Sequence, residues 1–380
     1  MATMSTYKPH PQGRLSLSNL RSMSIWRQSR DQSSMLPRAM PPAPGILTGK
    51  DASSDASTDT TDSALNDGSR TAELDPQQGR EWTKRQEDVL LAPYNYLLQQ
   101  KGKNIRGQLI QAFNEWLGVP TEKLEGITRV VEMLHTASLL VDDIEDFSTL
   151  RRGIPVAHSI YGEAQTINSA NYVYFLALQE VLKLDNPDAV RIFGEELVEL
   201  HRGQGLDLFW RDSFRCPTEA EYVSMVAQKT GGLFRLAIKL MQAESDCKLD
   251  LCALADVIGV LFQIRDDYLN LASAQYSDAK GLCEDLTEGK FSFLIIHGIQ
   301  ADTSDYRLLN IVQQRPRDDD VKRYAVSLLR QYGSFEYTER VLETLMERAR
   351  RMVEEFSEER GVAGQRMTAI LNAMRLKSSE

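Results

Sequence analysis

The sequence is poor in cysteine and contains no long apolar run, and both features limit what the chain can be. Its four cysteines, Cys216, Cys247, Cys252 and Cys283, are scattered and form no Cys-x-x-Cys pair. This spacing argues against disulfides and a zinc site, and it suits a reducing compartment such as the cytoplasm. No stretch of 18 apolar residues occurs, so the sequence predicts no membrane-spanning helix. The net charge of −10 makes nucleic acid a poor candidate as a partner.

Large apolar residues are also scarce in the first 80 positions. Seven of the 13 prolines lie at or before Pro76, and residues 52–75 are mostly Ser, Thr, Asp and Ala. Such a segment buries too little apolar surface to offset the entropy that it would lose on ordering. We therefore expect residues 1–80 to be a disordered extension and residues 81–380 to form the functional domain.

The first 30 residues contain basic side chains and no acidic ones, namely Lys8, Arg14, Arg21, Arg27 and Arg30. Mitochondrial transit peptides have this composition. A soluble basic tail has it too, as does a linker left from a larger architecture. The composition alone leaves these interpretations open.

From Gln86 onward, apolar residues recur at helical spacing, as in the stripe formed by Val130, Leu134, Ala137 and Val141. No alternating pattern of convincing length predicts a β-strand, and no internal repeat is present. The pattern predicts an all-α fold, a single helical bundle with a central cavity between facing helices. Further helices are predicted at residues 166–184, 189–208, 218–243, 249–272, 321–330 and 335–356.

Two acidic clusters about 120 residues apart, Asp142–Asp146 and Asp266–Asn270, lie inside apolar runs that otherwise predict buried helices. Carboxylates are rarely buried without a partner. Residues i and i+4 share one face of a helix, so Asp142 should point with Asp146, and Asp266 with Asn270. Two such faces across a cavity predict a site for Mg²⁺, which a few carboxylates hold together with substrate phosphates.

Basic residues beside Gly or Thr bracket both acidic clusters. Arg suits bidentate phosphate binding and Lys acts as a point charge. Lys103 and Arg106 are expected on one face of a helix that starts there. A single Lys/Arg pair is more often a solvated surface charge, but five such sites predict two bound diphosphates and suggest a reaction that joins two hydrocarbon groups. The other four sites are Arg151-Arg152-Gly153, Lys229-Thr230-Gly231-Gly232, Lys280-Gly281 and Gly289-Lys290.

The order and spacing of these motifs resemble the all-trans isoprenyl diphosphate synthases, and specifically the eukaryotic, fungal-like geranylgeranyl diphosphate synthases. Two positions depart from that pattern. Thr136 stands where Asn is expected beside His135, and Asn270 replaces the third Asp of shorter-chain relatives. The resemblance runs from about Tyr94 to Met346 and rests on residues 102–106, 139–146, 150–153, 201–205, 228–232 and 262–270.

The resemblance implies a Mg²⁺-dependent 1′-4 condensation of isopentenyl diphosphate with an allylic diphosphate by a homodimer or larger homo-oligomer. The allylic substrate would be farnesyl diphosphate, or dimethylallyl or geranyl diphosphate, and the product geranylgeranyl diphosphate. About three Mg²⁺ ions would be bound. The implied metal ligands are Asp142, Asp143, Asp146, Asp266 and Asp267, which with Lys229 are the implied catalytic residues. The implied ligands of the allylic diphosphate are Arg151, Lys229, Thr230, Gln263, Asn270, Lys280 and Lys290, and those of isopentenyl diphosphate are Lys103, Arg106, His135 and Arg152.

Small side chains just before the first acidic cluster favour a C20 product over C15. Ala137 and Ser138 occupy the helical turn where a bulky residue would close the product tunnel in farnesyl synthases. We expect the opposing helix to set the final depth of the tunnel through Asn168, Tyr172 and Phe175.

Two other function classes are compatible with an Asp-rich helical bundle. A class I terpene cyclase would carry an Asn/Asp…Ser/Thr…Glu triad as its second metal motif, whereas this chain has Asp266-Asp267. A catalytically weak regulatory subunit of a heteromeric synthase would be expected to lose part of an Asp cluster, and this chain keeps both.

Overall fold

The computed structural model describes residues 81–376 except 101, 103 and 273–281. The expectations for residues 1–80 and for Lys103 and Lys280 lie outside the described residues. The helices from Lys84 onward belong to one compact unit. Their bounds are α1 (Lys84–Leu90), α2 (Ala92–Leu98), α3 (Ile105–Leu117), α4 (Thr121–Glu145), α5 (Ala157–Tyr161), α6 (Glu163–Leu182), α7 (Pro187–Asp212), α8 (Glu219–Ala243), α9 (Cys252–Ala272), α11 (Glu284–Glu288), α12 (Phe293–Ala301), α13 (Arg307–Gln314), α14 (Asp319–Gln331), α15 (Ser334–Arg360) and α16 (Gln365–Ala373).

The all-α prediction is confirmed, and each helix predicted from periodicity is present with ends shifted by a few residues. Local sequence explains where several helices start. At α8, the Thr218 hydroxyl accepts a hydrogen bond from the backbone N–H of Glu221, and the Glu221 carboxylate accepts one from the backbone N–H of Thr218. This capping box satisfies two N–H groups that a helix start leaves unpaired. At α7, Asn186 caps a helix whose first residue is Pro187.

The start of α3 corrects one expectation. The backbone of Asn104 is left-handed, with φ of 44°, and the helix begins only at Ile105. A left-handed residue cannot continue a right-handed helix, and Asn tolerates that conformation better than most residues. The helix that carries Arg106 therefore starts later than predicted, and the expected shared face with Lys103 involves a residue outside the described ones.

A short antiparallel hairpin, missed by the sequence analysis, follows α4. Strand β1 (Leu150–Arg151) pairs with β2 (Ile154–Pro155), and two residues per strand are too few to give an alternating pattern. The turn residues Arg152 and Gly153 both have positive φ, of 56° and 79°. Two-residue hairpin turns of this kind match the twist of the paired strands. The hairpin folds the chain back onto the end of α4.

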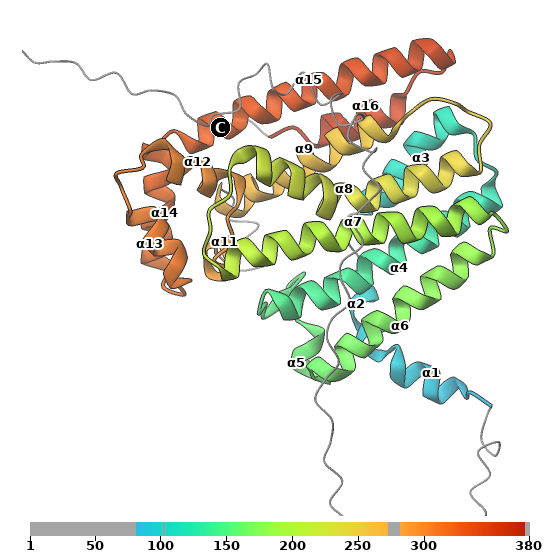
Figure 1. Cartoon of the computed structure of the whole chain (residues 1–380), viewed down its shortest axis with the longest axis horizontal. Coiled ribbons are helices and arrows are strands. Elements are labelled where there is room, and N and C mark those ends of the chain that lie inside the picture. The colour runs from blue at the N-terminus through green and yellow to red at the C-terminus, as the bar shows by residue number, and fades with distance from the viewer. Residues whose placement is uncertain (1–80, 101, 103, 273–281, 377–380) are drawn as a thin grey trace, which may run out of the picture. The chain divides into compact units, whose positions relative to one another are not determined.

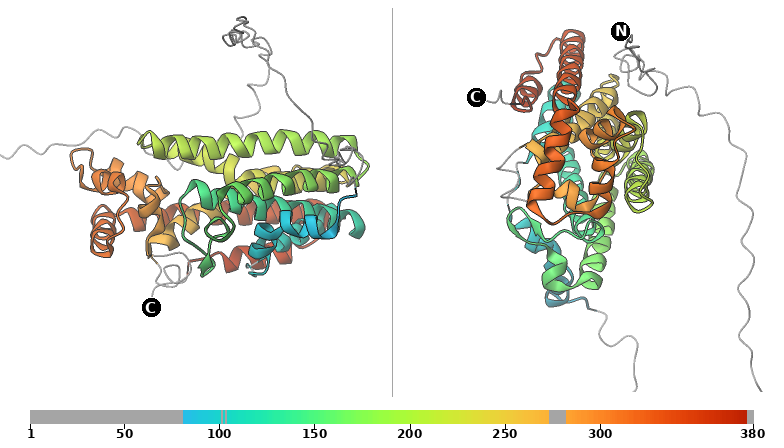
Figure 2. Two further views of the ribbon diagram at one scale, coloured as in Figure 1. Left: turned by 90° about the horizontal axis from the view of Figure 1, so that it is seen from below. Right: turned by 90° about the vertical axis from the view of Figure 1, so that its left-hand side faces the viewer.

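The long helices α4, α6, α7, α8, α9 and α15 form the body of the bundle (Figure 1). The C-terminal ends of α4 and α7 lie at the same end of the bundle, next to α11. Figure 2 shows α13 and α14 at this end as well. Of the predicted apolar stripe of α4, Val130, Leu134 and Ala137 are buried, whereas Val141 is half-buried. Among the described helices, none combines the length and apolar character needed to cross a bilayer.

Candidate active site

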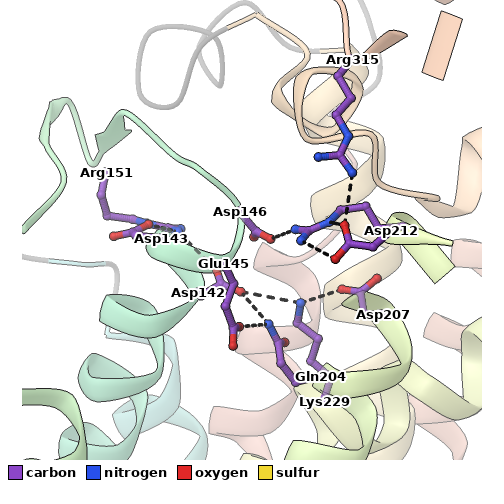
Figure 3. Close-up of polar contacts among 11 residues, drawn as sticks. Asp142, Asp143, Glu145, Asp146, Arg151, Gln204, Asp207, Asp212, Lys229 and Arg315 are labelled. Atoms are coloured by element: carbon purple, nitrogen blue, oxygen red, sulfur yellow. Dashed lines mark hydrogen bonds and ion pairs between the residues drawn. The ribbon is translucent and has the colours of Figure 1, made fainter. Parts of the chain in front are cut away.

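The first acidic cluster lies at the C-terminal end of α4, where the helix stops at Glu145. Figure 3 shows Asp142, Glu145 and Asp146 directed toward α7, and Asp143 directed toward the hairpin. The backbone N–H of Asp146 donates to the carbonyl of Asp142 at 2.8 Å, so the helical spiral continues through this residue. Asp142 and Asp146 therefore lie on one face, as the i, i+4 spacing predicts.

One face of α7 supplies a polar counterpart to this cluster. Gln204 Nε2 donates to Glu145 Oε2 at 2.7 Å, and Arg211 Nη1 donates to Asp146 Oδ1 at 2.7 Å. Asp207 lies between them on the same face. The spacing i, i+3, i+7 of these three residues is the signal that could have revealed this face from sequence.

Asp143 is buried and connects α4 to the hairpin. Arg151 Nε donates to Asp143 Oδ1 at 2.6 Å, and Arg151 Nη2 lies 3.3 Å from Asp142 Oδ2. Burial raises the pKa of Asp143 above its ordinary value, although the charge of Arg151 acts in the opposite direction. Within the described residues, Asp143 Oδ2 is a buried oxygen without a hydrogen-bond partner. Arg151 thus approaches both carboxylates from the hairpin side.

Lys229 of α8 lies between two carboxylates, as Figure 3 shows. Its Nζ is 2.7 Å from Asp207 Oδ2 and 3.7 Å from Asp142 Oδ1. Burial acts to lower the pKa of Lys229, but Asp207 and Asp142 outweigh burial and raise it. Burial acts to raise the pKa of Asp207, but Lys229 and Lys290 outweigh it and lower that pKa. Both groups are therefore charged at neutral pH, and the ammonium is directed at the first acidic cluster.

The second acidic cluster is anchored inside the bundle through Asp267, which is 1% exposed. Its Oδ2 accepts hydrogen bonds from the Tyr222 hydroxyl at 2.5 Å and from the backbone N–H of Phe293 at 2.9 Å. Gln263 Nε2 donates to its Oδ1 at 2.9 Å, and Gln263 Oε1 accepts from the Thr230 hydroxyl at 2.9 Å. Asp267 thus ties α8, α9 and α12 together. Sequence reasoning missed Tyr222, because its partner lies 45 residues away along the chain.

Two further predicted ligands surround Asp267. Lys290 Nζ lies 3.9 Å from Asp267 Oδ1. Burial acts to lower the pKa of Lys290, but Asp285, Asp267 and Asp207 raise it well above its ordinary value. Asn270 is buried, and its Oδ1 accepts a hydrogen bond from the backbone N–H of Asp285 at 3.3 Å. Asn270 therefore connects α9 to α11, while Lys290 adds a positive charge between the two acidic clusters.

A separate cationic cluster forms where α3, α4 and the hairpin meet. Arg106 Nη1 lies 2.9 Å from His135 Nε2, and Arg152 Nη1 donates to the carbonyl of Gln100 at 2.5 Å. Because Arg has no acceptor, His135 Nε2 must accept this hydrogen bond and the ring is neutral. Burial, followed by the charges of Arg106 and Arg152, lowers the pKa of His135 to about 2. Burial and Arg152 lower the pKa of Arg106 to about 10, whereas Asp266 acts to raise it.

These three residues present an excess of positive charge. Within the described residues, Arg106 Nε is buried without a hydrogen-bond partner. A buried guanidinium N–H that lacks an acceptor is costly unless a ligand supplies one. The cluster of Arg106, His135 and Arg152 is therefore suited to binding an anion.

The neutral state of His135 predicts a pH dependence of stability. The ordinary pKa of histidine is 6.5, and that of His135 in the folded protein is about 2. Between these two pH values, His135 is therefore protonated in the unfolded chain but not in the folded protein. The stabilisation is fully present above pH 6.5 and is progressively lost below it. Relative to His135→Asn, the wild type should lose about 1.4 kcal/mol of unfolding free energy between pH ~7.5 and pH ~5.5.

Urea unfolding at the two pH values would measure this difference. A His201→Asn variant is the matched control, because it removes a histidine from an exposed site on α7. Parallel pH profiles for wild type and His135→Asn would contradict the assignment.

The expectation for the wall of the product tunnel is partly wrong. Ala137 is buried, but Phe175 on the opposing helix is 67% exposed and Asn168 is also exposed. The Tyr172 hydroxyl donates to Glu87 of α1 at 2.8 Å. The helical phase of α6 turns a different set of side chains toward α4. Ala137 instead belongs to a small apolar cluster with Tyr94, Leu97, Leu140, Ala157, Ala170 and Val173.

The donor atoms of the acidic clusters fit Mg²⁺, which prefers hard carboxylate oxygens. Asp143 Oδ2 is one such buried oxygen, as described above. No group of three Asp, Glu, His or Cys side chains within the described residues is arranged as a metal site. Arg151, Arg211 and Lys229 lie against the carboxylates of the first cluster instead. The chemistry of the donors fits the ion, and the cations around them indicate where a diphosphate would lie.

Comparison with known proteins agrees with this geometry. The family model described as polyprenyl synthetase matches residues 87–329. A geranylgeranyl pyrophosphate synthase from Hypoxylon pulicicidum is 59% identical over 291 residues, which are 77% of this chain and 76% of that one. Another from Zymoseptoria tritici is 57% identical over 304 residues, which are 78% of this chain and 88% of that one.

A relative with a different name shares the same region. A copalyl diphosphate synthase from Talaromyces verruculosus is 60% identical over 268 residues, which are 70% of this chain but 28% of that one. Most of that protein therefore lies outside the match. The family model spans more than half of the chain, and the matched residues include both acidic clusters and the cationic cluster. The chain therefore belongs to the polyprenyl synthetase family.

Proposed function

We propose that the protein is a trans-prenyltransferase of isoprenoid biosynthesis that condenses isopentenyl diphosphate with an allylic diphosphate to give geranylgeranyl diphosphate. The observation that carries this proposal is the presence of two separate groups of cationic side chains, each suited to one diphosphate. One lies among the acidic clusters and Lys229, and the other is the cluster of Arg106, His135 and Arg152. Relatives named geranylgeranyl pyrophosphate synthase, 57% and 59% identical, support the product.

The allylic diphosphate would bind where α8, α9 and the hairpin converge. Lys229, Thr230 and Arg151 offer donors there, and Gln263 holds Thr230 in place. Lys290 adds charge from the segment after α11. Lys280 and Asn270 complete the proposed set, the latter by holding α11 against α9.

Isopentenyl diphosphate would bind to the cationic cluster. Arg106 supplies the buried N–H that lacks an acceptor, and neutral His135 fixes the orientation of its guanidinium. Arg152 adds a second guanidinium from the hairpin turn. Lys103 belongs to the proposed set from its place in the motif.

Mg²⁺, about three ions per site, is the proposed cofactor. Asp142, Asp143, Asp146, Asp266 and Asp267 are the proposed ligands, and Asp143 Oδ2 is a buried oxygen that lacks a hydrogen-bond partner within the described residues. When bound, the ions would neutralise charge on the allylic diphosphate and make it a better leaving group.

In the reaction, the allylic C–O bond breaks, a C–C bond forms to isopentenyl diphosphate, and a proton leaves for the departing diphosphate. Lys229 and Arg151 stabilise the negative charge that grows on that diphosphate. Arg106, Arg152 and His135 hold the second substrate with its double bond near the reacting carbon. The proposed apolar tunnel would keep water away from the allylic cation.

The test is the chain length of the product. Purified protein would be incubated with Mg²⁺, farnesyl diphosphate and isopentenyl diphosphate, and the dephosphorylated product compared with standards. A C20 alcohol is expected. A hydrocarbon released without isopentenyl diphosphate would favour a terpene cyclase, and absence of any condensation product would favour a regulatory subunit.

Ala137 is expected to control product length. It is fully buried beside Leu97, Ala170 and Val173, so Ala137→Phe would place a ring across the space between α4, α6 and α2. The main product should shift from C20 to C15, with a loss of about 1–3 kcal/mol in stability from overpacking. Product chromatography would measure the shift, with Ala137→Ser as the small control. A C20 product from Ala137→Phe would refute this position as part of the tunnel wall.

We further propose that the protein is a homodimer or larger homo-oligomer. Apolar side chains spaced seven or eight residues apart stay exposed on α6, namely Ile167, Phe175 and Leu182, and Val198 and Phe209 are similarly exposed on α7. Such stripes on adjacent helices are typical of an interface. Light scattering that returned the monomer mass would contradict an oligomer.

We place the protein in the cytoplasm, where its four free thiols would stay reduced. The competing proposal is mitochondrial targeting by the basic N-terminus. Fluorescent fusions with and without residues 1–80 would separate the two.

A further inference from the structure

The segment of α8 that carries Lys229 and Thr230 is held between two other helices at very short range. A Cβ atom added to Gly203 of α7 would lie 2.4 Å from the backbone nitrogen of Lys229. A Cβ atom added to Gly259 of α9 would lie 2.8 Å from the Cα of Gly231. Figure 1 shows α8 running between α7 and α9. Gly203 and Gly259 therefore allow the backbones of α7 and α9 to contact that of α8. A small shift of α8 would displace the side chains of Lys229 and Thr230, which face the proposed site.

Arg235 connects all three helices beside this crossing. Its Nη1 donates to Asp256 Oδ1 of α9 at 2.7 Å, and its Nε donates to Glu196 Oε2 of α7 at 3.1 Å. The same Nη1 reaches back along α8 to the carbonyl of Ala227 at 2.5 Å. The Arg235 side chain is 14% exposed and that of Glu196 only 3%, so the hydrogen bond between these two side chains is shielded from water. Charge-assisted hydrogen bonds of this kind are stronger than neutral ones.

Ala227 precedes Lys229 by two residues, so the hydrogen bond from Arg235 holds the backbone of α8 just before Lys229 and Thr230. The hydrogen bonds of Arg235 go to groups that are not among the proposed substrate ligands. Its effect on substrate would therefore pass through the backbone. Lys229 Nζ must stay 2.7 Å from Asp207, and the Thr230 hydroxyl 2.9 Å from Gln263. A displacement of about 1 Å can cost about 100-fold in rate.

We propose that Arg235 is a positioning residue, which clamps α7, α8 and α9 and so sets Lys229 and Thr230 for the allylic diphosphate. The inference rests on the proposed function of that subsite. The isopentenyl diphosphate subsite stands on α3, α4 and the hairpin instead. Arg106 lies over the ring of Phe234 at 5.6 Å, but its bond to His135 holds it to α4. The effect of Arg235 is therefore selective for the allylic substrate.

Arg235→Gln tests the clamp, and Lys239→Gln is its matched control. Lys239 lies one turn further along α8 and pairs with the same Glu196. In Arg235→Gln, Glu196 keeps Lys239, and Asp256, with a side chain 29% exposed, can be hydrated, so the fold is retained. The KM for farnesyl diphosphate should rise about tenfold, while the KM for isopentenyl diphosphate stays within about twofold. Lys239→Gln should leave both KM values within about twofold, and Arg235→Lys should recover part of the loss.

Calorimetric binding of farnesyl diphosphate with Mg²⁺, without the second substrate, gives a readout that does not need turnover. Its affinity should fall about tenfold in Arg235→Gln and stay unchanged in Lys239→Gln. Equal effects on both KM values, or equal effects of both substitutions, would overturn the clamp. A wild type that binds farnesyl diphosphate but forms no C20 product would refute the proposed function and not this inference.

Should Arg235→Gln fail to fold, Asp256→Asn replaces it: a selective rise of about threefold in the allylic KM supports the clamp, and an unchanged KM refutes it.

Discussion

Replacing Asp142 with alanine should abolish condensation and leave the protein folded. Three donors converge on this carboxylate, from Arg151 at 3.3 Å, Gln204 at 3.5 Å and Lys229 at 3.7 Å. Its loss removes a proposed metal ligand at the place where negative charge must be balanced. We expect kcat to fall about 10³-fold or more in a product assay with Mg²⁺, farnesyl diphosphate and isopentenyl diphosphate.

Stability should change little in Asp142→Ala, because its cationic neighbours keep other partners. Lys229 keeps Asp207 and Arg151 keeps Asp143. Glu125→Gln, at an exposed position on the same helix, is the control and should match the wild type. If Asp142→Ala kept activity within tenfold of the wild type, the proposed role of Asp142 as a metal ligand would be wrong. Full activity of the isolated wild-type chain, lost in Asp142→Ala, would also exclude the regulatory-subunit alternative.

Lys229→Met should lose both activity and stability, and a second substitution should separate the two losses. Without Lys229, the largely buried carboxylate of Asp207 loses the ammonium that lies 2.7 Å from it and keeps only the charge of Lys290 nearby. Breaking a buried ion pair from one side costs about 3–5 kcal/mol, because the remaining charge is uncompensated. Adding Asp207→Asn removes that charge, so the double variant should recover most of the unfolding free energy but stay inactive.

Urea unfolding and the product assay would measure the two effects in parallel. Lys183→Met is the matched control, since Lys183 pairs with Glu180 at the surface and its side chain is 68% exposed. Surface pairs contribute about 0–1 kcal/mol. If the double variant regained activity with its stability, Lys229 would be structural and the proposed role in diphosphate binding would be wrong.

The family and the two acidic faces could be predicted from sequence because their signals are local. A carboxylate such as Asp142 inside an apolar run stands out against its neighbours, and the i, i+4 rule then gives its face. The comparisons confirm the resemblance that these motifs suggested. The helices were predictable for the same reason, since each apolar stripe repeats within a few residues.

Contacts between distant segments gave no such signal. Asp207 and Tyr222 are polar residues on helices with many others, and their partners lie 22 and 45 residues away. The left-handed backbone of Asn104 decides where α3 starts, and no periodicity shows it. Phe175 misled the prediction because α6 carries apolar residues on more than one face, so its phase could not be assigned.

The hairpin after α4 carries two successive arginines that contact different partners. Arg151 faces Asp143, on the side of the proposed allylic diphosphate. Arg152, at the left-handed turn, reaches the carbonyl of Gln100 on the side of the cationic cluster. If the substrates bind as proposed, an anion on either side draws on the same few residues of backbone. If binding of the first substrate changes the affinity for the second by some factor, thermodynamic linkage requires that binding of the second changes the affinity for the first by the same factor.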